Sequence, residues 1–306
     1  MNISSESTVI CEKSIIELIM EIRPKVFNMK KNIREFVFKN YKDLTIYQLD
    51  DFITLERNKI GGDYFFPNCI SQGTIVAHKV CSLNETTKLT GQKLNIDFGL
   101  IYKNIIPVDT AITIIFKKNS EEDILEKKIG QCIRSTIRFI DETSKISNLK
   151  IAKYVQSYFS SEKYSIASGL CGHTLTPERL HGDTIIPNIY EKDHLVPYKE
   201  LKIGEFFTIE PFVSIRKKND NSLVEPVEED YNEPAECFFL GNYPFSFKVL
   251  AIEKNERALL NYKNNLNKEF SESHPIISPN LKEIIQVEQT FFISKQGVIP
   301  VSTIFD

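Results

Sequence analysis

Single carboxylates stand inside apolar segments that otherwise have the pattern of buried β-strands. Asp97 lies within residues 94–99, Glu210 within residues 205–213 and Glu288 within residues 283–292. A buried carboxylate costs free energy unless it is paired, hydrogen-bonded or bound to a metal. Any fold of this chain must therefore either supply partners for these acids or place them on edge strands, where acids are common.

Helical and strand patterns are mixed along the chain. Pro24 should end the first helix because proline cannot continue the backbone hydrogen bonding. A polar stretch over residues 216–236 interrupts the strand pattern and is typical of an insertion. The order of segments predicts one mixed domain, α+β with α/β as the alternative. The predicted helices cover residues 7–23, 45–59, 120–139, 148–160 and 252–268, and the predicted strands cover residues 73–80, 93–99, 110–116, 205–213 and 283–292.

The charge balance excludes some classes of partner. The 306 residues include 38 Lys and Arg against 41 Asp and Glu, a formal charge of -3, so there is no global basic field for DNA or an anionic membrane. Every apolar run is too short to span a bilayer, and the N-terminus lacks a basic segment followed by an apolar one. Six scattered cysteines without CxxC spacing fit a reducing compartment. We expect a cytoplasmic monomer without DNA or membrane partners.

The acids and one histidine form a ligand set. A hairpin turning near residues 102–104 would place Asp109 opposite Asp97, and a divalent cation would relieve their repulsion. The alternative is that each Asp only caps a strand or a turn. Two Asp, two Glu and His173 suit Mn, Co, Fe or Zn in a two-metal site, although a lone histidine is more often a hydrogen-bonded core residue.

Short motifs surround the candidate ligands along the chain. They are Phe66-Pro67 with Val76-Ala-His78, Ile96-Asp-Phe-Gly99 with Asp109-Thr-Ala-Ile-Thr113, Gly172-His173 with Leu180-His-Gly182, Ile209-Glu-Pro-Phe212, and Val287-Glu-Gln-Thr290. These motifs resemble the methionine aminopeptidases of the pita-bread fold, and specifically their type II branch. The 77 residues between Glu210 and Glu288 leave room for the helical insertion that marks type II. Three features depart from the family pattern: an extra residue between Asp97 and Asp109, Gln289 in place of the usual His, and Thr-Leu-Thr after His173.

The resemblance implies the fold, the cofactors and the site. It implies one α+β pita-bread domain over residues 1–306, with antiparallel sheets covered by helices and an inserted helical subdomain over about residues 216–280. It implies two divalent metal ions and removal of the initiator methionine from nascent polypeptides whose second residue is small; a ribosome contact is left open. The implied metal ligands are Asp97, Asp109, His173, Glu210 and Glu288, the catalytic residues are His78, His181 and Glu210, and the substrate-binding residues are Phe66, His78, Leu180, His181 and His274.

Two other functions remain compatible with the sequence. One is a non-catalytic binding protein on the same scaffold, of the proliferation-associated type, and retention of all five ligand types argues against it. The other is a relative of prolidase or aminopeptidase P, which shares the ligand order. Those enzymes usually carry a separate N-terminal domain, and only 77 residues precede His78.

Overall fold

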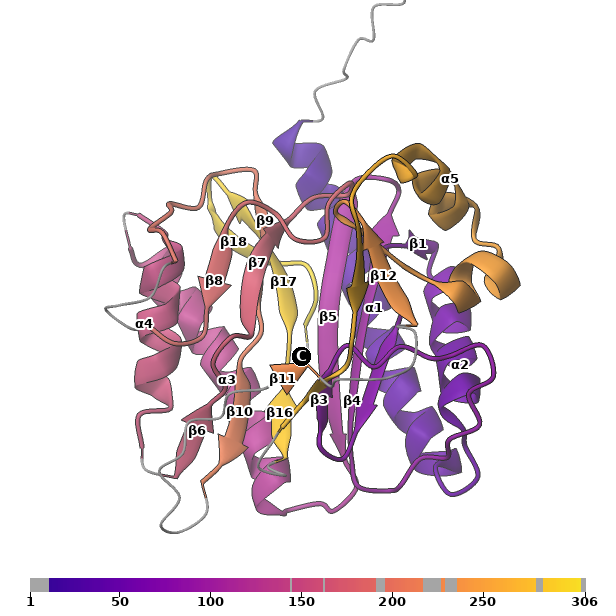
Figure 1. Ribbon diagram of the computed structural model, residues 1–306. Helices are drawn as coiled ribbons and strands as arrows, with labels where there is room; N and C mark the ends of the chain where they lie inside the picture. Colours follow the sequence, from indigo (N-terminus) through magenta and orange to yellow (C-terminus); the bar gives the residue numbers. More distant parts are fainter. Residues whose placement is uncertain are drawn as a thin grey trace, which may run out of the picture.

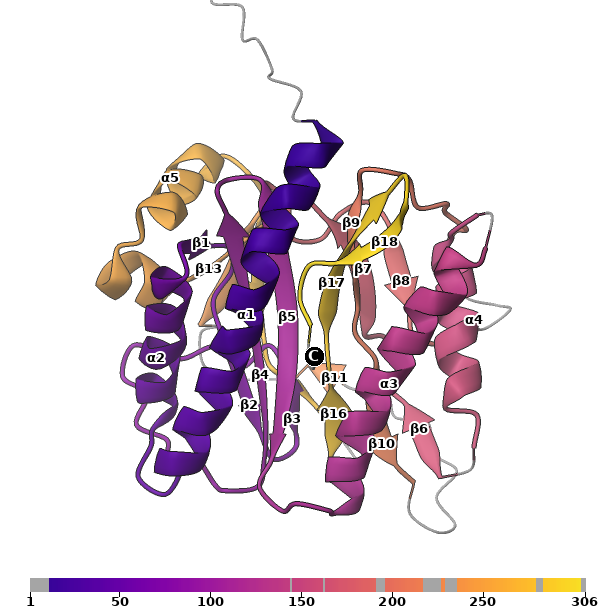
Figure 2. The same cartoon turned by 180° about the vertical axis from the view of Figure 1, so that it is seen from behind.

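Two halves of similar construction, each a β-sheet with two helices on one face, lie side by side in the computed structural model (Figure 1). The structure describes residues 11–143, 145–161, 163–190, 196–216, 227–228, 236–278 and 283–303. Seen from behind, helices α1 and α3 cross in front of the strands, and α2 and α4 lie at the two outer edges (Figure 2). No helix within these ranges is both long and apolar enough to cross a membrane.

The first half packs two helices against an antiparallel sheet. Helices α1 (Glu12–Asn40) and α2 (Ile46–Lys59) cover strands β1 (Gly62–Tyr64), β2 (Cys69–Gln72), β4 (Lys93–Tyr102) and β5 (Ile106–Ile115). The sheet order is β1-β4-β2, with β5 paired to β4. Thr45 and Gln48 form a capping box that starts α2 at the predicted place. Buried aliphatic and aromatic side chains from both layers form one core.

The second half repeats this arrangement. Helices α3 (Glu121–Asp141) and α4 (Asn148–Tyr158) pack on a five-stranded sheet of order β18-β17-β9-β7-β8. A three-stranded sheet of order β16-β10-β6 continues it. The strands are β6 (Tyr164–Ile166), β7 (Cys171–Leu175), β8 (Ile185–Pro187), β9 (Phe206–Ile209), β10 (Phe212–Ile215), β16 (Ile284–Gln286), β17 (Gln289–Ser294) and β18 (Gly297–Pro300).

The first helix is longer than the sequence predicts. It continues through Pro24 to Asn40, so the predicted stop at Pro24 is wrong; residues 7–10 of the prediction lie outside the described residues. Proline costs an interior helix about 3 kcal/mol. The helix buries Ile22, Val26 and Met29 on either side of Pro24, and burial of such side chains contributes about 1.5–3 kcal/mol each. The apolar stripe therefore outweighs the missing hydrogen bond.

Two predicted strands are each divided at an acid. Residues 205–213 form β9 and β10, which belong to different sheets and are separated by Glu210 and Pro211. Residues 283–292 form β16 and β17, separated by Val287 and Glu288. Proline cannot donate to a strand ladder, so Pro211 is a natural break. At both breaks a glutamate lies between two sheets. Its side chain therefore does not follow the alternation of side chains within a strand.

The segment that the sequence predicts as a helical insertion is a mixture of sheet and helix in its described part. Strands β12 (Cys237–Leu240), β13 (Tyr243–Ser246) and β14 (Phe270–Ser273) form a sheet of order β13-β12-β14. A π-helical turn, η1 (Val249–Glu253), and helix α5 (Glu256–Asn265) connect β13 to β14. Strands β11 (Val227–Glu228) and β15 (Ile276–Ile277) extend β3 (Ile75–Ala77). The remainder of the predicted insertion lies outside the described residues.

Candidate metal centre

Strands β4 and β5 carry the first two predicted ligands. The β4–β5 hairpin turns at residues 103–105, as predicted, with Lys103 and Asn104 in the left-handed region. Asp97 pairs with Ala111 and Asp109 pairs with Gly99, so the two acids are offset by two residues and are not directly opposite as expected. Residues two apart on a strand share a face, so both carboxylates still reach one side of the hairpin.

The other three predicted ligands come from the second half. His173 lies on β7, Glu210 follows β9 and Glu288 precedes β17. His173 Nε2 is 3.5 Å from Asp109 Oδ2 and 3.9 Å from Glu210 Oε1. One ligand atom each of Asp109, His173 and Glu288 lie within 4.8 Å of one another. All five side chains line one cavity of about 450 Å³, so the structure brings the whole predicted ligand set together.

The carboxylates of this cluster repel one another in the absence of a counter-ion. Burial, followed by the charge of Asp109, raises the pKa of Asp97 and of Glu288 well above the usual range. Burial and the same neighbour raise the pKa of Glu210 well above its usual value. The pKa of Asp109 rises to about 7, again through burial. Concentrating four buried carboxyl groups in this way is unfavourable unless cations bind between them.

The residues present fit two divalent metal ions. Asp97 Oδ1 and Glu288 Oε1 are buried oxygens without a hydrogen-bond partner, as expected of atoms reserved for a ligand. Burial lowers the pKa of His173 to about 3, so its imidazole is neutral and can donate a lone pair. Oxygen-rich sites with one imidazole suit Mn, Co, Fe or Zn.

Hydroxyl groups fix the backbone of the ligands where the two halves meet. Thr290 Oγ1 accepts from Asp109 N at 2.8 Å and donates to Asp109 O at 2.6 Å. Thr110 Oγ1 donates to Glu288 O at 2.8 Å. Each threonine is adjacent to or two residues from a ligand, so each half of the molecule orients a ligand of the other.

A carboxamide pair holds Glu210. Gln286 Nε2 donates to Glu210 Oε2 at 3.2 Å, and Asn95 Nδ2 donates to Gln286 Oε1 at 2.5 Å. Both amides are buried. The Asn95 contact orients the amide of Gln286, so that its NH₂ group faces the carboxylate.

Two further histidines line the cavity, as the sequence predicts. His78 has a φ of 62°, a left-handed conformation that is rare for a residue with a side chain and is often found at functional sites. Burial, then the neighbouring His181, lowers the pKa of His78 to about 4. The ring of His181 lies 4.6 Å from that of His173, edge to face, and stacks on Phe239 at 6.0 Å. Neutral imidazoles here can donate hydrogen bonds to a bound peptide.

The apolar part of the cavity differs from the prediction at one position. Phe66 and Leu180 line it, whereas His274 does not and lies 3.4 Å from Glu272 instead. Gly99 leaves room for the Phe66 ring, because a Cβ at Gly99 would lie 2.1 Å from a ring carbon. Sequence reasoning missed the wall that the insertion contributes, which no motif marks: Cys237, Phe239, Asn242, Pro244 and Ser273.

The fold and the site define a class of protein. A model of metallopeptidase family M24 matches residues 6–256, and the chain therefore belongs to this family. Its architecture is the pita-bread fold of that family, α+β with antiparallel sheets.

The curated relatives are methionine aminopeptidases, at a distance. The chain is 25% identical over 266 residues to that of Methanocaldococcus jannaschii, covering 83% of this chain and 87% of the relative. It is 28% identical over 183 residues to the methionine aminopeptidase of Methanothermus fervidus, and the match covers 56% of this chain and 96% of the relative. The match therefore establishes homology to methionine aminopeptidases without assigning the type II branch.

Solved structures share the fold at low sequence identity. A methionine aminopeptidase from Thermotoga maritima has a TM-score of 0.60 and 16% identity, covering 94% of this chain and 97% of the other. A thermophilic Arx1 has a TM-score of 0.68 and 10% identity, and the match covers 94% of this chain and 91% of the other. At these identities the likeness concerns the fold alone.

Proposed function

We propose that this protein is a dinuclear metal-dependent aminopeptidase of type II that removes the initiator methionine from polypeptides whose second residue is small. The observation that carries the proposal is the convergence of five ligand-type residues with His78 and His181 on one cavity. We further propose that the protein acts as a monomer in the cytoplasm on nascent polypeptide chains.

Each side chain has a chemical task in this proposal. Asp97, Asp109, His173, Glu210 and Glu288 would hold two divalent ions, which when bound supply the Lewis acidity that activates water and polarises a carbonyl group. Glu210 takes up and returns the proton of the attacking water, since its carboxylate is buried beside the site. His78 and His181 donate hydrogen bonds to the scissile amide and to the oxygen on which negative charge develops.

The shape of the cavity supports the substrate class. Phe66 and Leu180 offer apolar surface for the unbranched methionine side chain. The wall formed by Phe239 and His181 lies beside the ligand His173, and in this proposal it restricts the size of the second residue of the peptide. We expect Gly, Ala, Ser, Thr, Val, Pro or Cys to be accepted at that position and larger residues to be rejected.

Metal analysis combined with methionine release from a Met-Ala-Ser peptide tests the proposal. Two ions per chain are expected, and Asp97→Asn should lose both metal and activity. His78→Ala and His181→Ala should keep the metal and lose about 10²–10³ in kcat, since they stabilise charge mainly in the transition state. His274→Ala is the matched control, because His274 lies off the cavity. Normal turnover in either cavity variant would remove that histidine from the mechanism.

A second candidate is a binding protein that has kept the site without catalysis. The fold does not separate this candidate from the enzyme, because the solved structures share it at only 10–16% identity. Retention of all five ligand types opposes it. Absence of methionine release from protein that holds two metal ions would favour the binding protein.

A further inference from the structure

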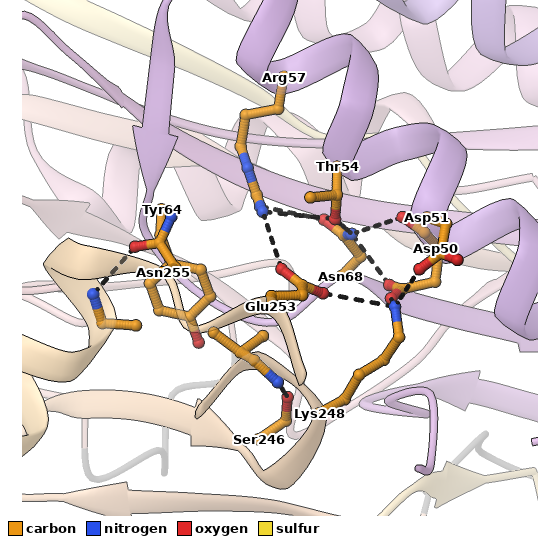
Figure 3. A network of polar contacts seen from close by, with 12 residues as sticks. Asp50, Asp51, Thr54, Arg57, Tyr64, Asn68, Ser246, Lys248, Glu253 and Asn255 are labelled. Carbon is orange, nitrogen blue, oxygen red and sulfur yellow. Dashed lines mark hydrogen bonds and ion pairs between the residues drawn. The ribbon is translucent and has the colours of Figure 1, made fainter. Parts of the chain in front are cut away.

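A buried ionic network lies behind the cavity wall that the insertion provides. Lys248, only 1% exposed, pairs with Asp50, with Asp51 at 2.6 Å and with Glu253 at 3.4 Å. Arg57, also 1% exposed, lies 3.9 Å from Glu253. Figure 3 shows Lys248 reaching from the insertion to the acids of α2, with Arg57 on the other side of Glu253.

The network joins the insertion to the first half of the molecule. Asp50, Asp51 and Arg57 belong to α2, whereas Lys248 and Glu253 flank or belong to η1. Asn68 Nδ2 donates to Asp50 Oδ1 at 2.9 Å, which ties the loop after Phe66 and Pro67 to the same group. Burial lowers the pKa of Lys248, but the acids outweigh it and the net shift is upward, so the lysine stays charged.

The strand that precedes Lys248 forms part of the cavity wall. Cys237 pairs with Ser246 and Phe239 pairs with Pro244 in the β12–β13 ladder. Cys237, Phe239 and Pro244 line the cavity, whereas Phe238 and Phe245 on the other face join an aromatic cluster. One face of the β12–β13 hairpin is therefore the cavity wall, and Lys248 follows the end of β13 by two residues.

The network and the cavity share their boundary. Pro67 and Val80 line both the cavity and the small polar space around Lys248 and Arg57. Tyr64 Oη donates to Pro244 O at 3.0 Å in the same region. A shift of Lys248 relative to α2 would therefore move Pro244 and the residues paired with it.

We propose that Lys248 is a positioning residue for the substrate cavity, where its ion pairs with α2 fix β13 and, through it, the wall formed by Cys237, Phe239 and Pro244. An apolar contact would tolerate sliding of the hairpin. A buried ammonium group allows far less sliding of the hairpin, because displacing Lys248 would leave the ammonium group and its acidic partners without their ion pairs. The kinetic part of this inference rests on the proposed function.

The test compares Lys248→Met with Lys263→Met, a control on the exposed part of α5. Because Lys248→Met leaves Asp50 without its cation and can impair folding, the double variant Asp50→Asn/Lys248→Met is measured as well. We expect both Lys248 variants to raise KM for Met-Ala-Ser about tenfold with kcat nearly unchanged, since the wall orients the substrate without taking part in the chemistry. Both should keep two metal ions per chain.

Hydrogen exchange of residues 237–246 gives a readout that does not depend on catalysis. Faster hydrogen exchange of these residues in the folded double variant, with a wild-type exchange rate in Lys263→Met, would support the proposal that the ion pairs of Lys248 fix β13. A wild-type KM and wild-type exchange in the double variant would overturn it, as would a fall of kcat and metal content with KM unchanged. If the metal-loaded wild type releases no methionine, the proposed function fails and the exchange rate alone decides the inference.

Discussion

Replacing Asp109 by Asn should stabilise the metal-free protein at neutral pH relative to the wild type. In the metal-free fold, burial raises the pKa of Asp109 from 3.8 to about 7. The folded state then binds a proton that the unfolded chain has already released, so stability is lost as the pH rises between these two values. Asparagine has nearly the same shape, carries no charge and can donate to Glu288 through its amide.

The loss of unfolding free energy follows from the width of the pH interval between 3.8 and about 7. Each pH unit within it is worth about 1.4 kcal/mol, so ionisation of Asp109 costs the metal-free fold about 4 kcal/mol in full. Between pH 5 and pH 7 the wild type should lose about 2–3 kcal/mol relative to the variant. The variant also lacks the negative charge that raises the pKa values of Asp97, Glu210 and Glu288, and this widens the difference in the same direction.

Urea unfolding of chelator-treated protein, followed by circular dichroism, measures this difference. Asp43→Asn is the matched control, because the Asp43 side chain is 94% exposed. With excess divalent metal the order should reverse, since the wild type then binds the ions and the variant loses a ligand. Parallel stability curves for wild type and Asp109→Asn between pH 5 and pH 7 would refute the account of the site's electrostatics.

Three further outcomes follow from the same contacts. Mn²⁺ at 100 times its dissociation constant should stabilise the wild type by about 2.7 kcal/mol and Asp97→Asn much less; equal shifts of the melting temperature would contradict the ligand assignment. Gly99→Ala should cost about 1–3 kcal/mol in thermal melts, because its Cβ meets the Phe66 ring at 2.1 Å, and Phe66→Leu should relieve part of this; an unaltered melt speaks against the contact. Thr290→Val should destabilise by about 1–3 kcal/mol and weaken metal binding, since it leaves two backbone groups of Asp109 unpaired; wild-type metal affinity would show that Thr290 does not orient the ligand.

The sequence by itself determined the local elements and the identity of the acids that need partners. The apolar pattern of residues 93–99 predicted β4, and the helical patterns of residues 45–59 and 120–139 predicted α2 and α3, because these signals depend on neighbours within a few residues. Asp97, Glu210 and Glu288 stood out because an acid in an apolar run needs compensation wherever the chain folds. The ligand chemistry of two Asp, two Glu and His173 suggested a two-metal site, and the resemblance to a known family then assigned each residue its role.

Tertiary structure decided what depends on distant parts of the chain. The helix through Pro24 exists because the core accepts an apolar stripe along its whole length, a gain that no local pattern reports. Glu210 and Glu288 reach the site because their strands break between two sheets, not because of alternation within one strand. His274 and the wall from Cys237 to Pro244 were placed by long-range packing, in which the Lys248 network joins residues about 200 positions apart. Such contacts depend on the fold as a whole, since their energies arise only after both partners are brought together and buried.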